Sequence, residues 1–299
     1  MNAKLSRILI LLLCGSAENG RYSDNGGILS VPEPTRIRAR RQVAPCCRGS
    51  RNLSLVLIPE MKSPLTFVLV HGAWHGGWCW RRVADLLRKD GHLVFTPTLT
   101  GFGERVHLTR PDLTLEDFAT DLVKVITTEE LSDVILVGHS FGGNPVSVVA
   151  DRVPELLKQL VYLDTLLLKN GESGFSQLDS AIVAQRIASA EKTSGGLTIP
   201  PPSPEVFGVV DPADAEWVRR RLTPLPLNCY QVPIRLDHPL GNGLSKTYIA
   251  CTNPVYQPAV RTHEWVKRQT GWQYLELATG HDAMVISPKE LAATLAGCP

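Results

Sequence analysis

The sequence lacks any uninterrupted apolar run of the roughly 20 residues that a membrane-spanning helix requires. It also lacks a strong excess of either charge, since 31 Lys and Arg stand against 29 Asp and Glu in 299 residues. Residues 1–60 hold nine basic and four acidic residues, a net +5, whereas residues 61–299 hold 22 and 25, a net −3. This mildly acidic body excludes the clustered positive charge by which proteins bind nucleic acid. We therefore expect neither a membrane span nor a nucleic-acid partner.

Cysteine pairs with the short spacing of a zinc site are missing as well. The seven cysteines stand at positions 14, 46, 47, 79, 229, 251 and 298, and their odd number argues against a closed disulfide framework. The sequence predicts no metal centre, and no motif in it indicates an organic cofactor.

The first sixty residues support two different interpretations. Lys4 and Arg7 precede an apolar stretch and then small residues, the order of a secretory signal that is cleaved after Ala17. The rest, up to Arg51, has no sustained period and is predicted to be a disordered leader. Alternatively, translation starts at Met61, shortly before the first predicted strand. The protein is cytoplasmic if it starts at Met61, and secreted or periplasmic if residues 1–17 act as a signal. We assign residues 1–60 to a leader and 61–299 to the folded domain.

Short apolar, β-branched runs alternate with segments of helical periodicity along this domain. Strands are predicted at 66–70, 92–96, 133–137, 159–163, 247–251 and 273–277, and helices at 78–89, from the N-cap Thr114 through 126, at 143–152, around 263–268 and from about 288. This alternation indicates a mostly parallel sheet with helices on both faces. It stops between Asp164 and Ser245, where helices are predicted only at 176–192 and 213–221, and we interpret residues 165–245 as a helical cap insertion.

The sequence Gly138-His-Ser-Phe-Gly-Gly143 contains the pattern G-x-S-x-G. It lies between a predicted buried strand and a predicted helix, which is the context of a nucleophile elbow. Glycines on both sides of Ser140 let the chain turn sharply from strand to helix. We predict that Ser140 is a nucleophile. The less favoured alternative is a serine that only caps the helix.

A serine hydroxyl needs a base, and His281 is the best-placed histidine for that role. It follows the last predicted strand, at the sheet edge where the elbow lies. His263 falls inside a predicted helix and His139 inside the turn, and we assign neither to proton transfer. The oxyanion of the reaction needs two N–H donors, predicted to be those of Phe141, after the nucleophile, and of Ala73, after the first strand.

Three segments together carry a resemblance to a known family. They are Phe67-Val-Leu-Val-His-Gly-Ala-Trp-His-Gly-Gly-Trp-Cys-Trp80, the elbow, and Gly280-His-Asp-Ala-Met284. They resemble the branch of the α/β-hydrolase fold that holds plant methylesterases, hydroxynitrile lyases and bacterial esterases, including pyrethroid hydrolases. The resemblance covers residues 61–299 and is weakest in the cap. It implies an oxyanion donor at Ala73 and an apolar pocket involving Trp74, His75, Trp78 and Trp80, although ordinary core packing explains Trp78 and Trp80 equally well.

The triad acid departs from the pattern of that family. Its members usually carry a carboxylate after the strand equivalent to 247–251, whereas this chain reads Cys251-Thr-Asn-Pro254 there. Glu264 is the next acid and lies in the following helix. Asp164 ends the strand after the elbow helix, so it should emerge at the same sheet edge as Ser140, and we predict it to be the acid. The alternatives are that Asp164 caps a turn, or that Asn253 orients the ring; Asp282 adjoins His281 and is expected to point away.

We predict a serine carboxylesterase that acts through an acyl-serine intermediate on a hydrophobic or aromatic ester. Phe207, Trp217 and Tyr230 of the cap are expected to shape the pocket. Two alternatives are a lyase of the hydroxynitrile type and a ligand-binding protein without activity. The lyases carry a lysine directly after the catalytic histidine, where this chain has Asp282, and a binding protein need not retain both Ser140 and His281.

Overall fold

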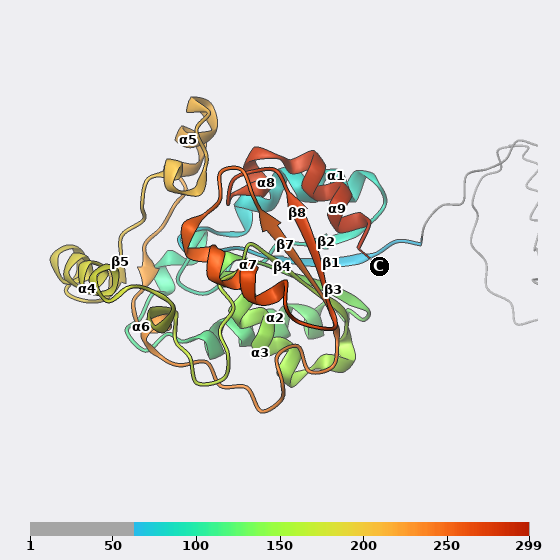
Figure 1. The fold of residues 1–299 in the computed structure, drawn as a ribbon, viewed down its shortest axis with the longest axis horizontal. Coiled ribbons are helices and arrows are strands. Elements are labelled where there is room, and N and C mark those ends of the chain that lie inside the picture. The colour runs from blue at the N-terminus through green and yellow to red at the C-terminus, as the bar shows by residue number, and fades with distance from the viewer. Residues whose placement is uncertain (1–62, 299) are drawn as a thin grey trace, which may run out of the picture. The chain divides into compact units, whose positions relative to one another are not determined.

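Each predicted run of Val, Ile and Leu forms a strand of one six-stranded sheet in the computed structural model, which describes residues 63–298 (Figure 1). The predicted leader, its signal and Met61 lie outside these residues. The strand order is β2-β1-β3-β4-β7-β8, and each neighbouring pair runs parallel. The predicted α/β-hydrolase architecture, a parallel sheet with crossover helices, is confirmed.

The elements agree with the sequence periodicity to within a few residues at their ends. The strands of the sheet are β1 (Thr66–Val70), β2 (Leu93–Phe95), β3 (Val134–His139), β4 (Leu157–Leu163), β7 (Ser245–Cys251) and β8 (Trp272–Leu277). The helices outside the β4–β7 connection are α1 (Arg81–Lys89), α2 (Leu115–Thr128), α3 (Gly143–Arg152), α7 (Val260–Val266), α8 (Ala283–Ile286) and α9 (Pro288–Ala296).

The helices form two layers, with α1, α8 and α9 on one side of the sheet and α2 and α3 on the other (Figure 1). All residues of β3 are buried, and β1, β4 and β7 are buried along most of their length, because both faces are covered. No helix within residues 63–298 is long and apolar enough to cross a membrane.

The strand register brings three chain segments to one level at the carboxyl edge of the sheet. His139, the last residue of β3, is in register with Leu163, the last residue of β4. Leu163 is in turn in register with Ile249 of β7, and Cys251 with Leu277 of β8. Because parallel strands end on the same edge, residues that directly follow β3, β4 and β8 can meet there.

The connection between β4 and β7, here called the cap segment (residues 165–244), contributes no strand to the large sheet. It contains α4 (Ser180–Ser194), α5 (Pro212–Arg219), α6 (Asn228–Gln231) and a two-stranded antiparallel sheet of β5 (Thr198–Ile199) and β6 (Leu225–Pro226). Alternating patterns did not predict β5 and β6, because two residues are too short to show a period. In Figure 1, α4, α5 and β5 stand to one side of the large sheet.

The turn from β3 into α3 is packed so tightly that its glycines have no room for a side chain. A Cβ on Gly138 would lie 2.5 Å from the Cα of Gly143, and one on Gly143 would lie 2.4 Å from Cγ2 of Thr165. The Thr165 hydroxyl donates a hydrogen bond to the Gly138 carbonyl at 3.0 Å, which ties the end of β4 to this turn. The glycine pattern therefore reflects close packing of backbone against backbone.

Substitution Gly138→Ala tests this packing. Gly138 is not among the residues with positive φ, so the added methyl acts only through its contacts with Gly143 and with the Gly142 carbonyl, at 2.8 Å. We expect a loss of about 1–3 kcal/mol in the free energy of unfolding, measured by urea denaturation. A variant as stable as the wild type would contradict the packing described.

Candidate active site

Ser140 stands at the sharp turn between β3 and α3, in a short 3-10 helix of residues Ser140–Gly142. Its φ of 52° is a conformation that non-glycine residues seldom adopt, and holding it costs on the order of 1–3 kcal/mol. The neighbouring glycines described above make room for this turn. The geometry is that of a nucleophile elbow, which exposes the side chain at the carboxyl edge of the sheet.

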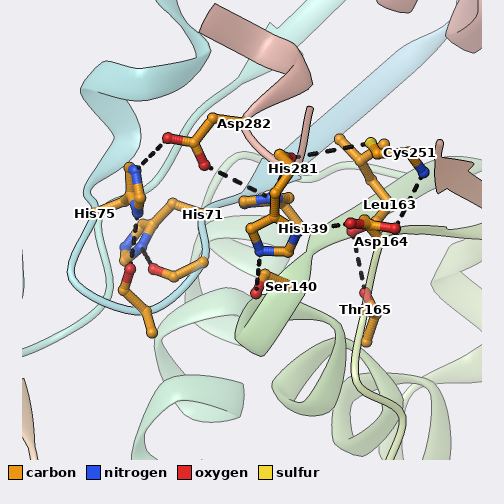
Figure 2. Close-up of polar contacts among 12 residues, drawn as sticks. His71, His75, His139, Ser140, Leu163, Asp164, Thr165, Cys251, His281 and Asp282 are labelled. Carbon is orange, nitrogen blue, oxygen red and sulfur yellow. Dashed lines mark hydrogen bonds and ion pairs between the residues drawn. The ribbon is translucent and has the colours of Figure 1, made fainter. Parts of the chain in front are cut away.

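The structure brings Ser140, His281 and Asp164 together in one hydrogen-bonded chain (Figure 2). The Nε2 atom of His281 lies 2.9 Å from the Ser140 hydroxyl, and its Nδ1 atom lies 2.7 Å from Oδ2 of Asp164. Because an ionised carboxylate only accepts hydrogen bonds, Nδ1 is the protonated nitrogen and Nε2 is free to accept from the serine. Three residues up to 141 positions apart in the chain thus have the arrangement of a serine hydrolase triad.

Asp164 is completely buried, and its φ of 47° turns the chain abruptly after β4. Its Oδ1 atom accepts hydrogen bonds from Nε2 of His263, at 2.7 Å, and from the Cys251 N–H, at 3.0 Å. Burial alone would raise the pKa of Asp164, but the hydrogen bonds from His263 and His281 outweigh it and hold the pKa well below its usual range. The carboxylate is therefore ionised, and its two oxygens accept three hydrogen bonds.

His263 is the residue of this site that the sequence reasoning missed. It lies on α7 and is buried with Val266, three residues later, on the face of the helix that turns to the sheet. The spacing of three residues places His263 on the same helix face as the apolar Val266, and a buried polar side chain needs a hydrogen-bond partner. This spacing could have indicated that His263 takes part in the site. Its location inside a helix was correct, but that location does not remove it from the site.

The other acids and amides considered at this position lie elsewhere. The Asn253 side chain is exposed, and its backbone N–H donates to the Thr279 carbonyl at 3.0 Å. Glu264 is exposed and pairs with Arg268, two residues beyond the end of α7. Neither contacts His281 in the described residues, whereas Asp164 does.

A second histidine, His139, supports the loop that carries His281. Its Nε2–H donates to the His281 carbonyl at 3.0 Å, and the two rings lie 4.7 Å apart. Burial and the neighbouring His281 lower the pKa of His139 to about 3, so its ring is neutral and serves as a hydrogen-bond donor.

The predicted oxyanion donors, Phe141 and Ala73, lie in segments that meet at Ser140. A Cβ on Gly72 would be only 3.1 Å from Cβ of Ser140, so the loop after β1 runs directly beside the nucleophile. Trp74, next to Ala73, has a φ of 65°, which is rare for a bulky residue. The cap segment fixes this strained residue, because its indole N–H donates to the Ile199 carbonyl and its own carbonyl accepts from the Thr223 N–H.

A buried ion pair connects the same loop to the His281 loop (Figure 2). Nε2 of His75 lies 3.0 Å from Oδ2 of Asp282, and both side chains are almost completely buried. Burial disfavours the charge of His75, but the charge of Asp282 and the hydrogen bonds to Asp282 and to the Ala73 carbonyl raise its pKa overall. Since both ring nitrogens face acceptors, His75 is doubly protonated.

A cleft of about 420 Å³ opens against His281. Its walls include Val206 and Phe207 of the cap segment and Val255 and Tyr256 of the loop after β7. The Tyr256 ring stacks on the His281 ring at a centroid distance of 4.0 Å. The cleft is therefore mainly apolar and reaches the imidazole of the triad.

The predicted pocket residues divide in two. Phe207 lies in the cleft wall, whereas His75 and Trp78 are not among the residues of that wall. His75 is turned away into its ion pair with Asp282, and Trp78 packs on His75 and on Trp217 beside a different cavity, near α1. Trp74 and Tyr230 are not among the residues of the cleft wall. Both pack against Arg186, which does line the cleft. Trp80 is completely buried in the core.

No group of three or more His, Cys, Asp and Glu side chains in residues 63–298 has the arrangement of a metal site. The hydrogen bonds from Ser140 to His281 and from His281 to Asp164 have the geometry that proton transfer by an imidazole and nucleophilic attack by a serine require.

Comparison with known proteins agrees with this geometry. Residues 67–294 match the model of the alpha/beta hydrolase family. The chain belongs to this family. It is 43% identical over 239 residues to a carbendazim hydrolyzing esterase of Nocardioides sp. (strain SG-4G), covering 77% of this chain and 98% of that protein. It is 38% identical over 102 residues to Methylesterase 9 of Arabidopsis thaliana, covering 34% of this chain and 40% of that one.

Among solved structures, an extracellular α/β-hydrolase from a Paenibacillus species superposes with a TM-score of 0.67 at 27% identity. The superposition covers 78% of this chain and 98% of that structure. These relatives identify the chain as an esterase-like α/β-hydrolase of the branch that the sequence motifs indicated.

Replacing Asp164 by Asn tests the buried carboxylate. The asparagine side chain has one oxygen, which can accept from only one of the two imidazoles. Its NH₂ group would face the N–H of the other imidazole. When that imidazole is His281, the wrong tautomer of His281 is favoured. We expect turnover of p-nitrophenyl butyrate to fall by about 10²–10⁴-fold, as in other triads that lose their acid. Glu264→Gln, on exposed α7 surface, is the matched control and should leave turnover unchanged. Near-normal turnover in Asp164→Asn would contradict the assignment.

Replacing Asp282 by Asn tests the buried ion pair through the pH dependence of stability. In the wild type the raised pKa of His75 keeps it protonated in the folded state, so its contribution is fully present below pH 6.5 and falls as the pH rises through the folded pKa. In the variant, burial keeps His75 neutral, and folding must release a proton below pH 6.5. The wild type should therefore exceed Asp282→Asn in free energy of unfolding by an amount that grows as the pH falls, by up to about 1.4 kcal/mol per pH unit below pH 6.5. Urea titrations between pH 5 and 8.5 measure this difference. A difference independent of pH would contradict the ion pair.

Proposed function

We propose that this protein is a serine carboxylesterase that hydrolyses hydrophobic or aromatic esters through an acyl-serine intermediate. The observation that carries the proposal is the chain of two short contacts, Ser140 to His281 at 2.9 Å and His281 to Asp164 at 2.7 Å, at the end of an apolar cleft. Ser140 is the nucleophile, His281 the general base and acid, and Asp164 the group that orients and stabilises the imidazolium.

The reaction proceeds in two halves. In the first, Ser140 Oγ attacks the ester carbonyl carbon while Nε2 of His281 takes the hydroxyl proton, and the oxyanion binds the N–H groups of Phe141 and Ala73. The tetrahedral intermediate then breaks the bond to the alcohol, which leaves with the proton from His281. In the second half, His281 removes a proton from water, the resulting hydroxide attacks the acyl-serine, and the acid is released as Ser140 recovers its proton.

The walls of the cleft support an apolar substrate with a flat group. The Phe207 and Tyr256 rings both stack on the His281 ring, with centroid distances of 6.0 and 4.0 Å. Aromatic walls of this kind favour stacking with a planar ligand. The relative from Nocardioides is named for hydrolysis of carbendazim, an aromatic methyl carbamate, and we include this compound and aromatic methyl esters in the proposed substrate range.

The two alternative functions receive less support from the site. The residue after His281 is Asp282, whose carboxylate is buried and paired with His75 and so does not present a charge to the cleft. A cyanide-binding lysine has no equivalent there, which argues against a hydroxynitrile lyase. A binding protein without activity would not require the strained Ser140 backbone or the hydrogen bond from Ser140 to His281.

A panel of substrates tests the proposal on the full chain. p-Nitrophenyl butyrate, methyl benzoate, carbendazim, a pyrethroid and mandelonitrile are assayed with the wild type and with Ser140→Ala. We expect hydrolysis of at least one ester or carbamate, loss of that activity by 10³-fold or more in Ser140→Ala, and no cleavage of mandelonitrile. Ser176→Ala, which removes an exposed serine of the cap segment, is the matched control. Unchanged activity in Ser140→Ala, or cleavage of mandelonitrile alone, would overturn the proposal.

A further inference from the structure

Arg186 of α4 is a cationic residue in the wall of the cleft that the proposed reaction does not use. Its guanidinium carbon lies 5.6 Å from the centroid of the Trp74 ring and 5.4 Å from that of the Tyr230 ring. Trp74 follows Ala73, and the Tyr230 ring stacks on Phe141 at 5.5 Å with an interplanar angle of 10°. The guanidinium is therefore held by the two aromatic residues that adjoin the proposed oxyanion donors.

This guanidinium has no partner of opposite charge. Other arginines of the cap segment, Arg219 and Arg220, form ion pairs with glutamates, but Arg186 is in none of the ion pairs of residues 63–298. Its Nη1 atom is buried and has no hydrogen-bond partner in that part of the chain. The acidic residue of the same wall, Glu205, is exposed and pairs with Arg219 at 3.2 Å.

The charge of Arg186 is poorly compensated by its neighbours in residues 63–298. The faces of aromatic rings attract a cation. They do not accept two hydrogen bonds from its N–H groups, as a carboxylate does. A cation in the wall of a cleft, in no ion pair with the rest of residues 63–298, is a partner for an anionic group of a ligand, because hydrogen bonds between charged groups are the stronger ones. The planar fork of a guanidinium matches the two oxygens of a carboxylate, and the half-buried position of Arg186 makes that contact stronger than it would be in open water.

We propose that Arg186 forms an anion subsite, which selects esters that carry a second, carboxylate group a few bonds from the scissile carbonyl. Half-esters of dicarboxylic acids are substrates of this class. The aromatic rings of Trp74 and Tyr230 hold the guanidinium, and the carboxylate binds the part of the guanidinium that faces the cleft. The inference rests on the proposed function, because Arg186 lines the same cleft as His281, and it refines the expectation of a purely apolar substrate.

Pairs of substrates that differ only in charge test the subsite. The mono-4-nitrophenyl esters of succinic, glutaric and adipic acid are each compared with a neutral ester in which an isopropyl group replaces the carboxylate. Arg186→Met keeps the apolar stem and removes the charge, and Arg186→Lys keeps the charge without the fork. Arg220→Met, at an exposed arginine of the cap segment, is the matched control.

We expect Arg186→Met to lower kcat/KM about 10- to 100-fold for at least one anionic ester, mainly through KM, and less than twofold for its neutral partner. For the anionic ester, kcat/KM of Arg186→Lys should lie between the values of the wild type and of Arg186→Met. Arg220→Met should change kcat/KM for neither member of the pair. An equal change for the charged and neutral member of every pair would overturn the subsite, as would no change for any anionic ester.

A binding measurement separates this inference from the proposed function. The monomethyl esters of the same acids are titrated calorimetrically into Ser140→Ala and into Ser140→Ala with Arg186→Met. The subsite predicts weaker binding in the double variant, by the same 10- to 100-fold, and equal affinities would overturn it. If the wild type hydrolyses no ester, the proposed function fails, but this titration still decides whether Arg186 binds the carboxylate.

Discussion

The site depends on one buried carboxylate that receives three N–H donors. Asp164 ends β4, and its oxygens accept from His281, from His263 on α7 and from the Cys251 N–H at the end of β7. An ionised group buried to this extent is tolerable only when hydrogen bonds replace its lost hydration. The same bonds fix the direction of the His281 ring toward Ser140. Three elements that are separate in sequence are thereby held at one point of the sheet edge.

The His281 loop is held from a second side as well, by His139 and by the ion pair of Asp282 with His75. His139 donates to the His281 carbonyl, and the adjacent Asp282 pairs with His75 of the loop after β1. Because that loop also carries Ala73, the ion pair joins the proposed oxyanion donor to the proposed general base, His281. The cap segment adds its own restraints through hydrogen bonds to Trp74 and through the Phe207 carbonyl, which accepts from the Asp282 N–H. Precise catalytic geometry thus comes from backbone and side-chain contacts spread over the whole edge of the sheet.

The sequence predicted the strands, the elbow and the meeting of Ser140, His281 and Asp164, because these follow from local periodicity and from the common direction of parallel strands. It did not predict the role of His263, since helical periodicity shows which face is buried but not which acid that face meets. It placed His75 in the pocket because an aromatic-rich loop resembles a pocket lining, whereas the ion pair with Asp282 draws the ring away. Arg186 lies on a predicted helix and Tyr256 in the loop after β7, but neither pattern shows which residues these side chains meet, so only the folded chain brings them to the cleft.

The proton positions on the imidazoles test the central claim most directly. Nitrogen-15 NMR of histidine-labelled protein, with assignments from His263→Gln and His281→Gln, reports which ring nitrogen carries the proton. In its neutral form His281 should be protonated on Nδ1 and free on Nε2, and His263 should carry a proton on the Nε2 that faces Asp164. A neutral His281 with its proton on Nε2 and a free Nδ1 would contradict the account, because Asp164 could then not be its partner.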